Sequence, residues 1–279
     1  MTLSGYIGAG WQSTGKTGAA VSGAAMTDSR IQLSGTEDLG GGLKASFVQQ
    51  FRVNGGVRAV DDVVGEDSSL SLGGGFGTVA YAKTRGGTLL TNALLSGASL
   101  ADDYWGGPLS RKSIDVVGYT APAMNGFTVG VSRAEAGTAT DATANHNHGT
   151  DGDGGVQITT VSVGYVAGPL AAGFARKSSA GLSTTTKNEA FASYDLGVAK
   201  AAVGYEKGSA DADAKTAFGV SVPMGALTAG VSYIKFGVNK YTDFGVSYAL
   251  SKRTAVQFAR GDYTTWANAS TRLRVIHNF

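Results

Sequence analysis

Cysteine is absent from the chain, proline is scarce and charged residues are few. The lack of cysteine excludes a disulfide scaffold, a thiolate metal site and a cysteine nucleophile. Four prolines beside 43 glycines exclude a collagen-like chain and argue against disorder. Charged residues make up 16% of the chain, whereas about 25% is usual in soluble proteins. Because the net charge is only +2, the placement of the charges should matter more than their sum.

Long apolar runs are missing as well. No run approaches the roughly 18 residues that a membrane-spanning helix needs, and the mean hydropathy is close to zero. Strands that face lipid on one side and water on the other explain both facts, because apolar and polar residues then alternate and average out. No signal peptide is visible before the first predicted strand, so we expect a processed or re-engineered chain, with Met1 added for expression.

Alternating segments of about eight to ten residues recur along the chain, the length that a tilted strand needs to cross a bilayer. In residues 2–11, Leu3 and Trp11 share an apolar face while Ser4 and Tyr6 share the other. The same alternation occupies residues 43–52 and 227–233. Aromatic residues stand near the ends of the apolar faces, which is typical of strands that end at a membrane interface.

The connections between these segments alternate in length. Short turns are predicted at 38–42, 73–77, 122–126, 168–169, 195–197, 223–225 and 251–253. Longer polar stretches lie at 12–29, 53–66, 86–112, 135–155, 179–186, 208–213, 237–240 and 263–269. Seven turns and eight loops join sixteen strands, with both termini on the short-turn side. This asymmetry predicts an all-β fold, a sixteen-stranded antiparallel transmembrane barrel that forms one domain over residues 1–279.

The third long stretch differs from the other loops. It has several leucines, among them Leu89, Leu90 and Leu95, followed by the acidic pair Asp102 and Asp103. A loop with this much apolar surface should pack against something instead of extending into water. We therefore expect the stretch of about 86–112 to fold into the barrel and narrow its interior.

Several motifs resemble the trimeric, sixteen-stranded general porins of β-proteobacteria. The segment Ser29–Ala45 resembles the second strand, first turn and third strand of that family, and Tyr248–Thr254 is the most specific match. Further matches in the family's order are Gly75–Val79, Tyr119–Pro122 with Gly126 and Phe127, Val222–Gly225, and the ending His277–Phe279. Together they span nearly the whole chain.

The resemblance implies an outer-membrane location in a Gram-negative bacterium and a homotrimer whose contacts lie near the chain termini. It also implies that the loop of about 53–66 reaches a neighbouring subunit, that the third loop folds inward, and that Phe279 is part of the assembly signal. Two positions depart from the family pattern, because Lys83, with Arg85 two residues on, replaces a usual arginine and Gly118 replaces another. The constriction should therefore be less rigidly basic than in relatives, since lysine is a mobile point charge.

The function predicted from these features is passive diffusion of small hydrophilic solutes through a water-filled channel, with mild anion preference and no catalysis. Fixed charges in a narrow interior with low-dielectric walls set ion selectivity. Strand parity assigns the interior positions to Arg30, Lys44, Arg52, Arg272 and Arg274, while Lys83 and Arg85 are placed at the mouth of the infolded loop, opposite Asp102 and Asp103. Lys16, Lys187, Lys207 and Lys240 are interpreted as solvated loop charges.

Other functions fit the sequence less well. A channel specific for organic acids or other anionic nutrients is the nearest alternative. Residues Gly10–Thr17 match the phosphate-binding loop pattern, but the glycine-containing stretch after Lys16 lacks the period of the helix that this motif requires. His146, His148, Asp151 and Asp153 could hold a structural Ca²⁺, yet the surrounding composition indicates a loop, and we expect no cofactor. Basic residues are too dispersed for a nucleic-acid interface.

Overall fold

The computed structural model describes residues 1–14, 21–27, 29–53, 63–85, 87–95, 113–134, 157–180, 184–263 and 269–279. The strands are β1 (Thr2–Thr14), β2 (Val21–Met26), β3 (Arg30–Gly40), β4 (Leu43–Val53), β5 (Val63–Gly74), β6 (Gly77–Arg85), β7 (Ser113–Thr120), β8 (Phe127–Ala134), β9 (Gln157–Ala167), β10 (Leu170–Ala180), β11 (Thr185–Asp195), β12 (Lys200–Gly208), β13 (Lys215–Met224), β14 (Leu227–Phe236), β15 (Asn239–Ala249), β16 (Thr254–Tyr263) and β17 (Ser270–Asn278). A short 3₁₀ helix, η1, spans Leu89–Ala93. No helix in the described ranges is long and apolar enough to cross a membrane.

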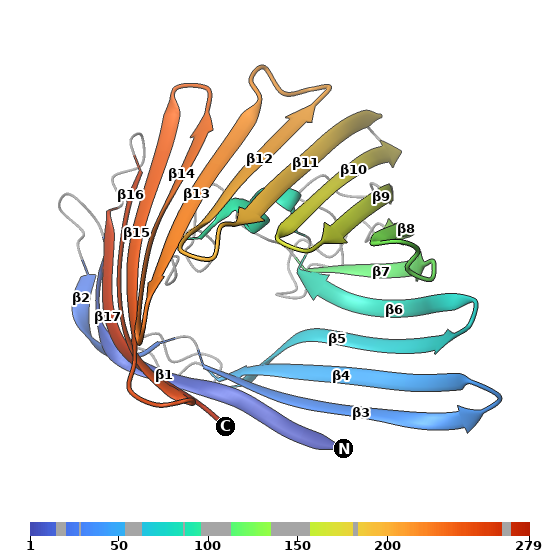
Figure 1. The fold of residues 1–279 in the computed structure, drawn as a ribbon, viewed down its shortest axis with the longest axis horizontal. Coiled ribbons are helices and arrows are strands. Elements are labelled where there is room, and N and C mark those ends of the chain that lie inside the picture. The colour runs from blue at the N-terminus through green and yellow to red at the C-terminus, as the bar shows by residue number, and fades with distance from the viewer. Residues whose placement is uncertain are drawn as a thin grey trace, which may run out of the picture.

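All strands belong to one antiparallel sheet that closes on itself (Figure 1). Closure is made by β1, which pairs with β17 on one side and with both β2 and β3 on the other. The strands β2 and β3 are two parts of one barrel strand, because β2 pairs with the second half of β1 and β3 with its first half. The seventeen hydrogen-bonded segments therefore form a sixteen-stranded barrel, as the sequence predicts.

At the break between β2 and β3, the side chain of Ser29 provides the hydrogen-bond partner that the backbone of β1 would otherwise lack. Thr27 N–H donates to the Gly8 carbonyl at 2.8 Å. Gly8 N–H donates to the hydroxyl of Ser29 at 3.1 Å, and this hydroxyl donates to the Thr27 carbonyl at 3.1 Å. Since unsatisfied backbone groups are costly within a membrane, Ser29 allows β1 to exchange one partner segment for the next without losing its ladder.

Turn lengths follow the predicted alternation. The connection between β7 and β8 contains the two-residue turn Asn125-Gly126, flanked by the pair Met124 and Phe127. Both turn residues have positive φ, at 50° and 85°, the geometry for which Asn-Gly is favoured in tight hairpins. Two boundary predictions were wrong by several residues: the end of β1 and all of β2 fall inside the predicted loop 12–29, and β5 begins at Val63, inside the predicted loop 53–66. Small residues dominate β2, so the apolar alternation that marks other strands is absent there.

The two faces of the sheet differ in chemistry as the alternation requires. Large apolar side chains point outward and are exposed, including Val203, Phe218, Val231 and Phe244. Aromatic side chains stand outward near the short-turn end, for example Tyr194, Tyr248 and Phe127. The buried apolar cluster lies instead on the inner face, around η1. An apolar exterior around a polar interior is the arrangement of a barrel solvated by lipid.

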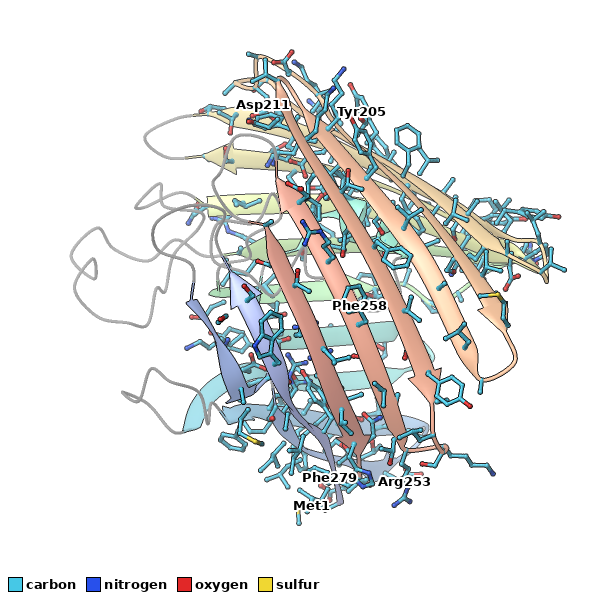
Figure 2. All side chains as sticks on the ribbon, turned by 90° about the vertical axis from the view of Figure 1, so that its left-hand side faces the viewer. Met1, Tyr205, Asp211, Arg253, Phe258 and Phe279 are labelled. Carbon is cyan, nitrogen blue, oxygen red and sulfur yellow. The ribbon has the colours of Figure 1, made fainter. Side chains whose placement is uncertain are left out.

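The termini meet at the short-turn end of the barrel. Gly5 N–H donates to the Phe279 carbonyl at 3.1 Å, and Phe279 N–H donates to the Gly5 carbonyl at 3.0 Å. Figure 2 places Met1 and Phe279 with Arg253 at one end of the tilted strands, and Asp211 at the other. The last residue therefore continues the β1–β17 seam. Its expected part in the assembly signal stays a prediction.

An arginine placed in the middle of the outer face should destabilise the barrel strongly. Val220 points outward from β13, and its neighbour Ser221 points inward. We expect Val220→Arg to lower the free energy of unfolding by about 2–4 kcal/mol, because the charge would enter the apolar band. Ser221→Arg serves as the matched control with a much smaller loss. Equilibrium urea unfolding in lipid vesicles measures both, and equal losses would contradict the assigned faces.

Candidate functional site

One wall of the interior is rich in arginine. Arg30 on β3 and Arg52 on β4 pair directly across the ladder on the inner face. The Glu66 carboxylate lies between them, with Oε2 2.6 Å from Arg30 Nε and Oε1 3.3 Å from Arg52 Nε. The Arg30 guanidinium also lies 5.8 Å from the centroid of the Tyr6 ring on β1. One carboxylate shared by two guanidinium groups leaves this group of three with a net positive charge.

The same wall continues onto the last strand. Arg272 and Arg274 of β17 point inward and are only 3% and 9% exposed. Arg274 Nε donates to Gln257 Oε1 at 2.9 Å. Because β17 pairs with β1 and β1 with β3, these arginines lie close in the ring to Arg30 and Arg52. We call the four together the arginine wall.

A second charged group lies about half the ring away, on β10–β13. We call it the lysine–glutamate wall; its members are Lys177, Lys187, Glu189, Glu206 and Lys215. Lys177 Nζ lies 2.7 Å from Glu189 Oε1. Glu206 Oε1 is shared by Lys187 at 3.4 Å and Lys215 at 3.0 Å. Both glutamates are almost fully buried, at 1% and 2% exposed, so each carboxylate is held by lysines and by the segment described next.

The start of the third long loop is hydrogen-bonded to this wall. Thr88 Oγ1 donates to Glu206 Oε2 at 2.5 Å, and Leu89 N–H donates to Glu189 Oε2 at 3.0 Å. Lys177 Nζ donates to the Gly87 carbonyl at 2.7 Å. At the other end of η1, Leu95 N–H donates to Ser232 Oγ at 2.9 Å. The segment 87–95 is thus fastened at both ends to the inner face of the barrel.

Apolar packing holds the middle of this segment. Leu90 and Ala93 are fully buried against Ala202, Ala217 and Ile234, with Leu94 and Leu95 packed beside them. Two inward glycines make the close approach feasible. A Cβ on Gly219 would lie 2.0 Å from the Ala93 carbonyl oxygen, and one on Gly204 would lie 3.1 Å from Leu90 Cα. The prediction that the third loop enters the barrel is confirmed for residues 87–95.

Not all of the residues predicted to line the interior point inward. Arg30, Lys44, Arg52, Arg272 and Arg274 have inward parity as expected. Lys83 does not, because it shares the outward parity of Tyr81 and Val79 and pairs with Ser68 and Asp115. Its predicted place beside the pore is therefore corrected. The side chain of Arg85 and both loop carboxylates, Asp102 and Asp103, lie outside the described residues.

Several interior charges were missed by the sequence reasoning. Lys187, interpreted as a loop charge, is an inward residue of β11, and its ammonium group forms an ion pair with the Glu206 carboxylate. Lys177, Glu189, Glu206, Lys215 and Glu66 were not singled out at all. Their signal was available, since Lys187 and Glu189 are two residues apart and alternate with small residues in a strand-like segment. What the sequence could not supply is their partners across the ladder.

Basic side chains outnumber acidic ones on the inner face of the described strands. The basic residues with inward parity are Arg30, Lys44, Arg52, Lys177, Lys187, Lys200, Lys215, Arg272 and Arg274, and the acidic ones are Asp38, Glu66, Asp67, Glu189, Asp195, Glu206 and Asp243. Charges in a narrow space with low-dielectric walls are weakly screened, so this balance sets the electrostatic field of the interior.

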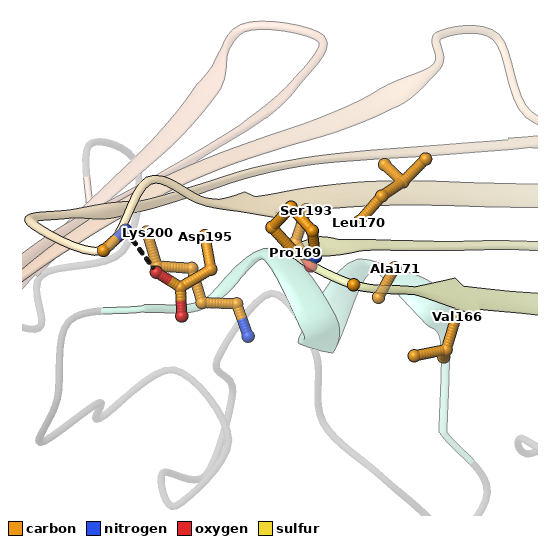
Figure 3. A pocket seen from close by; sticks show the side chains of 9 residues that line it. Val166, Pro169, Leu170, Ala171, Ser193, Asp195 and Lys200 are labelled. Carbon is orange, nitrogen blue, oxygen red and sulfur yellow. Dashed lines mark hydrogen bonds between the residues drawn. The ribbon is translucent and has the colours of Figure 1, made fainter.

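An open cavity of about 470 Å³ lies on the inner wall at the short-turn end, between the β9–β10 and β11–β12 turns (Figure 3). Pro169, Ser193, Asp195 and Lys200 contribute to its lining. The Asp195 carboxylate accepts a hydrogen bond from Gly197 N–H at 2.8 Å, so it shapes the turn. The cavity mixes small, apolar and charged side chains, and it forms part of the short-turn mouth of the barrel.

Neither alternative motif forms a site in the described residues. Gly10–Thr14, the first part of the phosphate-loop pattern, continue β1 as extended strand; Lys16 lies outside the described residues. His146, His148, Asp151 and Asp153 also lie outside them. Within the described ranges, no group of three or more histidine or carboxylate side chains is arranged to hold a metal ion.

Adding one methyl group at Gly219 should loosen the docked segment. We expect Gly219→Ala to increase hydrogen exchange of the backbone amides of residues 87–95 by at least tenfold, because the new Cβ overlaps the Ala93 carbonyl. Gly130→Ala is the matched control, since its Cβ would meet only Ser162 Oγ at 3.1 Å at close range. Hydrogen-exchange mass spectrometry measures both variants. Unchanged exchange in Gly219→Ala would contradict the docking.

Comparison with known proteins agrees with this architecture. The sequence model of the Gram-negative porin family matches residues 1–267. The anion-selective porin from Comamonas acidovorans superposes with a TM-score of 0.71 at 22% identity, covering 100% of this chain and 99% of that one. A triple mutant of the Rhodopseudomonas blastica porin gives a TM-score of 0.74 at 13% identity with the same coverage. No curated protein sequence matches significantly.

At these identities the structural matches show the fold, and the family match extends over nearly the whole chain. Membership places the barrel in the outer membrane, where its apolar exterior meets lipid and its polar interior meets water. It also makes the inner wall the surface past which solutes travel, so the chain is a channel protein and not an enzyme. On the strength of this match and of the closed sixteen-stranded barrel, the protein belongs to the Gram-negative porins.

Proposed function

We propose that this porin is a general diffusion channel that passes small hydrophilic solutes and ions, with a mild preference for anions. The excess of basic over acidic side chains on the inner face carries the proposal. Glu66 offsets one of the two arginines that it contacts, and the two glutamates of the lysine–glutamate wall face three lysines. The anion-selective porin from Comamonas acidovorans, with the same fold, supports the proposal.

The anion preference should be mild because most interior charges have a partner of opposite sign. An ion about 10 Å from one unit charge gains about 0.4 kcal/mol in water, which is a factor of roughly two in partitioning. Salt screening over a Debye length of about 10 Å at 0.1 M weakens the effect further. A net excess of a few charges therefore favours anions without excluding cations.

General diffusion is favoured over a substrate-specific channel by the geometry of the described interior. A specific site needs a concave pocket in which a few polar groups converge on the solute. The described cavity at the short-turn mouth is open, and one of its two charged side chains is engaged in its own turn. A channel for an organic acid remains the second candidate, because the arginine wall offers forked donors that fit carboxylates.

A homotrimer is part of the proposal. The β1–β17 seam presents an apolar outer surface that includes Leu3, Ile7, Trp11, Leu273 and Val275. Such a surface suits contact with another subunit as well as with lipid. Closure of single channels in three equal steps would identify the trimer in bilayer recordings. The predicted contact of loop 53–66 with a neighbour falls mostly outside the described residues.

Removing one charge from the arginine wall should weaken anion selectivity. Arg52 has the more exposed side chain of the pair on Glu66, at 37% against 23% for Arg30. We expect Arg52→Gln to lower the chloride-to-potassium permeability ratio by roughly a factor of two. Reversal potentials in a KCl gradient measure the ratio. Lys252→Gln, in an exposed turn, is the control and should leave it unchanged; cation preference in the wild type would refute the proposal.

The two candidate functions predict different responses to organic anions. A general pore should show a conductance that rises in proportion to KCl concentration, and no current block by micromolar citrate, succinate or benzoate. A specific channel should saturate and be blocked, because a bound solute excludes ions from the same path. Single-channel currents in planar bilayers distinguish the two outcomes.

A further inference from the structure

Four small residues lie together on the inner wall where η1 contacts it. Two come from β12 and two from β13, and in the ladder each alanine is directly opposite a glycine of the other strand. We call them the small-residue seat; its members are Ala202, Gly204, Ala217 and Gly219. The rows on either side of the seat hold larger side chains, Glu206 opposite Lys215 and Lys200 opposite Ser221.

The seat is covered, although it belongs to the face that lines the interior. All four of its residues are buried. The cover is η1, because Leu90 and Ala93 pack on the two alanines of the seat. Figure 1 shows η1 inside the ring, beside β11 and β12. Asn92 of η1 is exposed, so η1 meets the wall with one face and the interior with another.

The two glycines of the seat are required by space and not by backbone torsion. Neither is among the described glycines with positive φ, so other residues could adopt the same backbone conformation. A Cβ on Gly219, however, would lie 2.0 Å from the Ala93 carbonyl oxygen and 3.0 Å from Leu95 N. A Cβ on Gly204 would lie 3.1 Å from Leu90 Cα. The backbone of η1 therefore approaches the wall more closely than a side chain at position 219 would allow.

A side chain in the seat would displace η1 and not the wall. Gly219 belongs to a strand that is paired on both edges, with β12 and with β14, so it could retreat only by breaking the ladder. The first residues of the segment 87–95 are hydrogen-bonded to Glu189 and Glu206, which keeps the segment over this wall. Relief of the overlap at Gly219 then needs a movement of about 1–1.5 Å away from the wall, toward the pore axis.

We infer that Gly204 and Gly219 determine the width of the pore at the height of η1. They admit the backbone of η1 to the wall, whereas a larger residue would move η1 into the path of the solutes. They are positioning residues, because they act through η1 and need not touch a solute. The inference rests on the proposed general diffusion and names the residues that decide which solutes are too large, since passage through such a pore depends on its diameter.

Permeation of neutral sugars of different size tests the inference. Swelling of proteoliposomes compares the rates for a pentose and a disaccharide, and because neither is charged, anion preference does not affect the result. Gly219→Ala should lower the disaccharide-to-pentose ratio at least about threefold, because hindrance rises steeply as the solute approaches the width of the pore. Gly204→Ala, which has the milder overlap, should lower the ratio less.

The matched control is Gly130→Ala. It adds the same methyl group to the inner face of β8, where the new Cβ would be closest to Ser162 Oγ, at 3.1 Å. The control should keep the wild-type ratio, because it leaves η1 in place. Single-channel openings of each variant show that the barrel has formed.

A disulfide tests the docked position directly, because the chain has no cysteine of its own. Ala93 Cβ lies 3.5 Å from the position of a Cβ on Gly204, within the range found across disulfides. The oxidised Ala93→Cys/Gly204→Cys variant should keep the wild-type sugar ratio to within about twofold, since the bond holds η1 where it already lies.

Three results would overturn the inference: an unchanged or raised ratio in Gly219→Ala, an equal fall in Gly130→Ala, or a disulfide that does not form. Failure of the proposed function would appear in the wild type alone, as sugar rates that do not fall with size or as current block by micromolar organic anions. If the wild type excludes both sugars, single-channel conductance in KCl provides the comparison, and it should fall in Gly219→Ala but not in Gly130→Ala.

Discussion

The whole structure depends on the requirement that every backbone polar group in the lipid-facing wall finds a partner within the sheet. A barrel meets it only when the first strand pairs on both edges, and here β1 pairs with β17 along one edge and with β2 and β3 along the other. The ring forces the strict separation of faces, because a one-residue slip of register would turn a lipid-facing side chain inward. The apolar exterior, the charged interior and the placement of the loops all follow from this closed ladder.

Inside the ring, the contact between residues 87–95 and the inner wall buries both charged and apolar side chains. Glu189 and Glu206 would be costly in a buried position without partners, but lysines and the donors of Thr88 and Leu89 satisfy them. Leu90 then packs against alanines and Ile234 of the same wall. The segment that enters the lumen is held by directional bonds at its ends and by packing in its middle. Hydrogen bonds alone, or apolar packing alone, would hold the segment less firmly, because water in the interior competes for the same groups.

The fold was predictable from the sequence because alternation and turn chemistry are local signals. Leu3 and Trp11 on one face, or Asn125-Gly126 in a hairpin, can be recognised without knowing any partner strand. The arginine wall was predictable for the same reason, since parity assigns a face. Lys83 was misplaced because parity depends on register near a strand end, and Lys187 was missed because its partner Glu206 lies on another strand. Pairing across the ladder is a property of the folded ring that single segments do not contain.

The docking of η1 has a geometric consequence for traffic through the pore. The segment follows β6 in the chain and is hydrogen-bonded to β11, β12 and β14, on the far side of the ring. That wall is therefore covered where the segment lies, whereas Arg30 and Arg52 stand on strands of the opposite side of the ring. In the proposed channel, we expect permeating ions to pass closer to these guanidinium groups than a central path would bring them. A small number of fixed charges would then act on every passing solute.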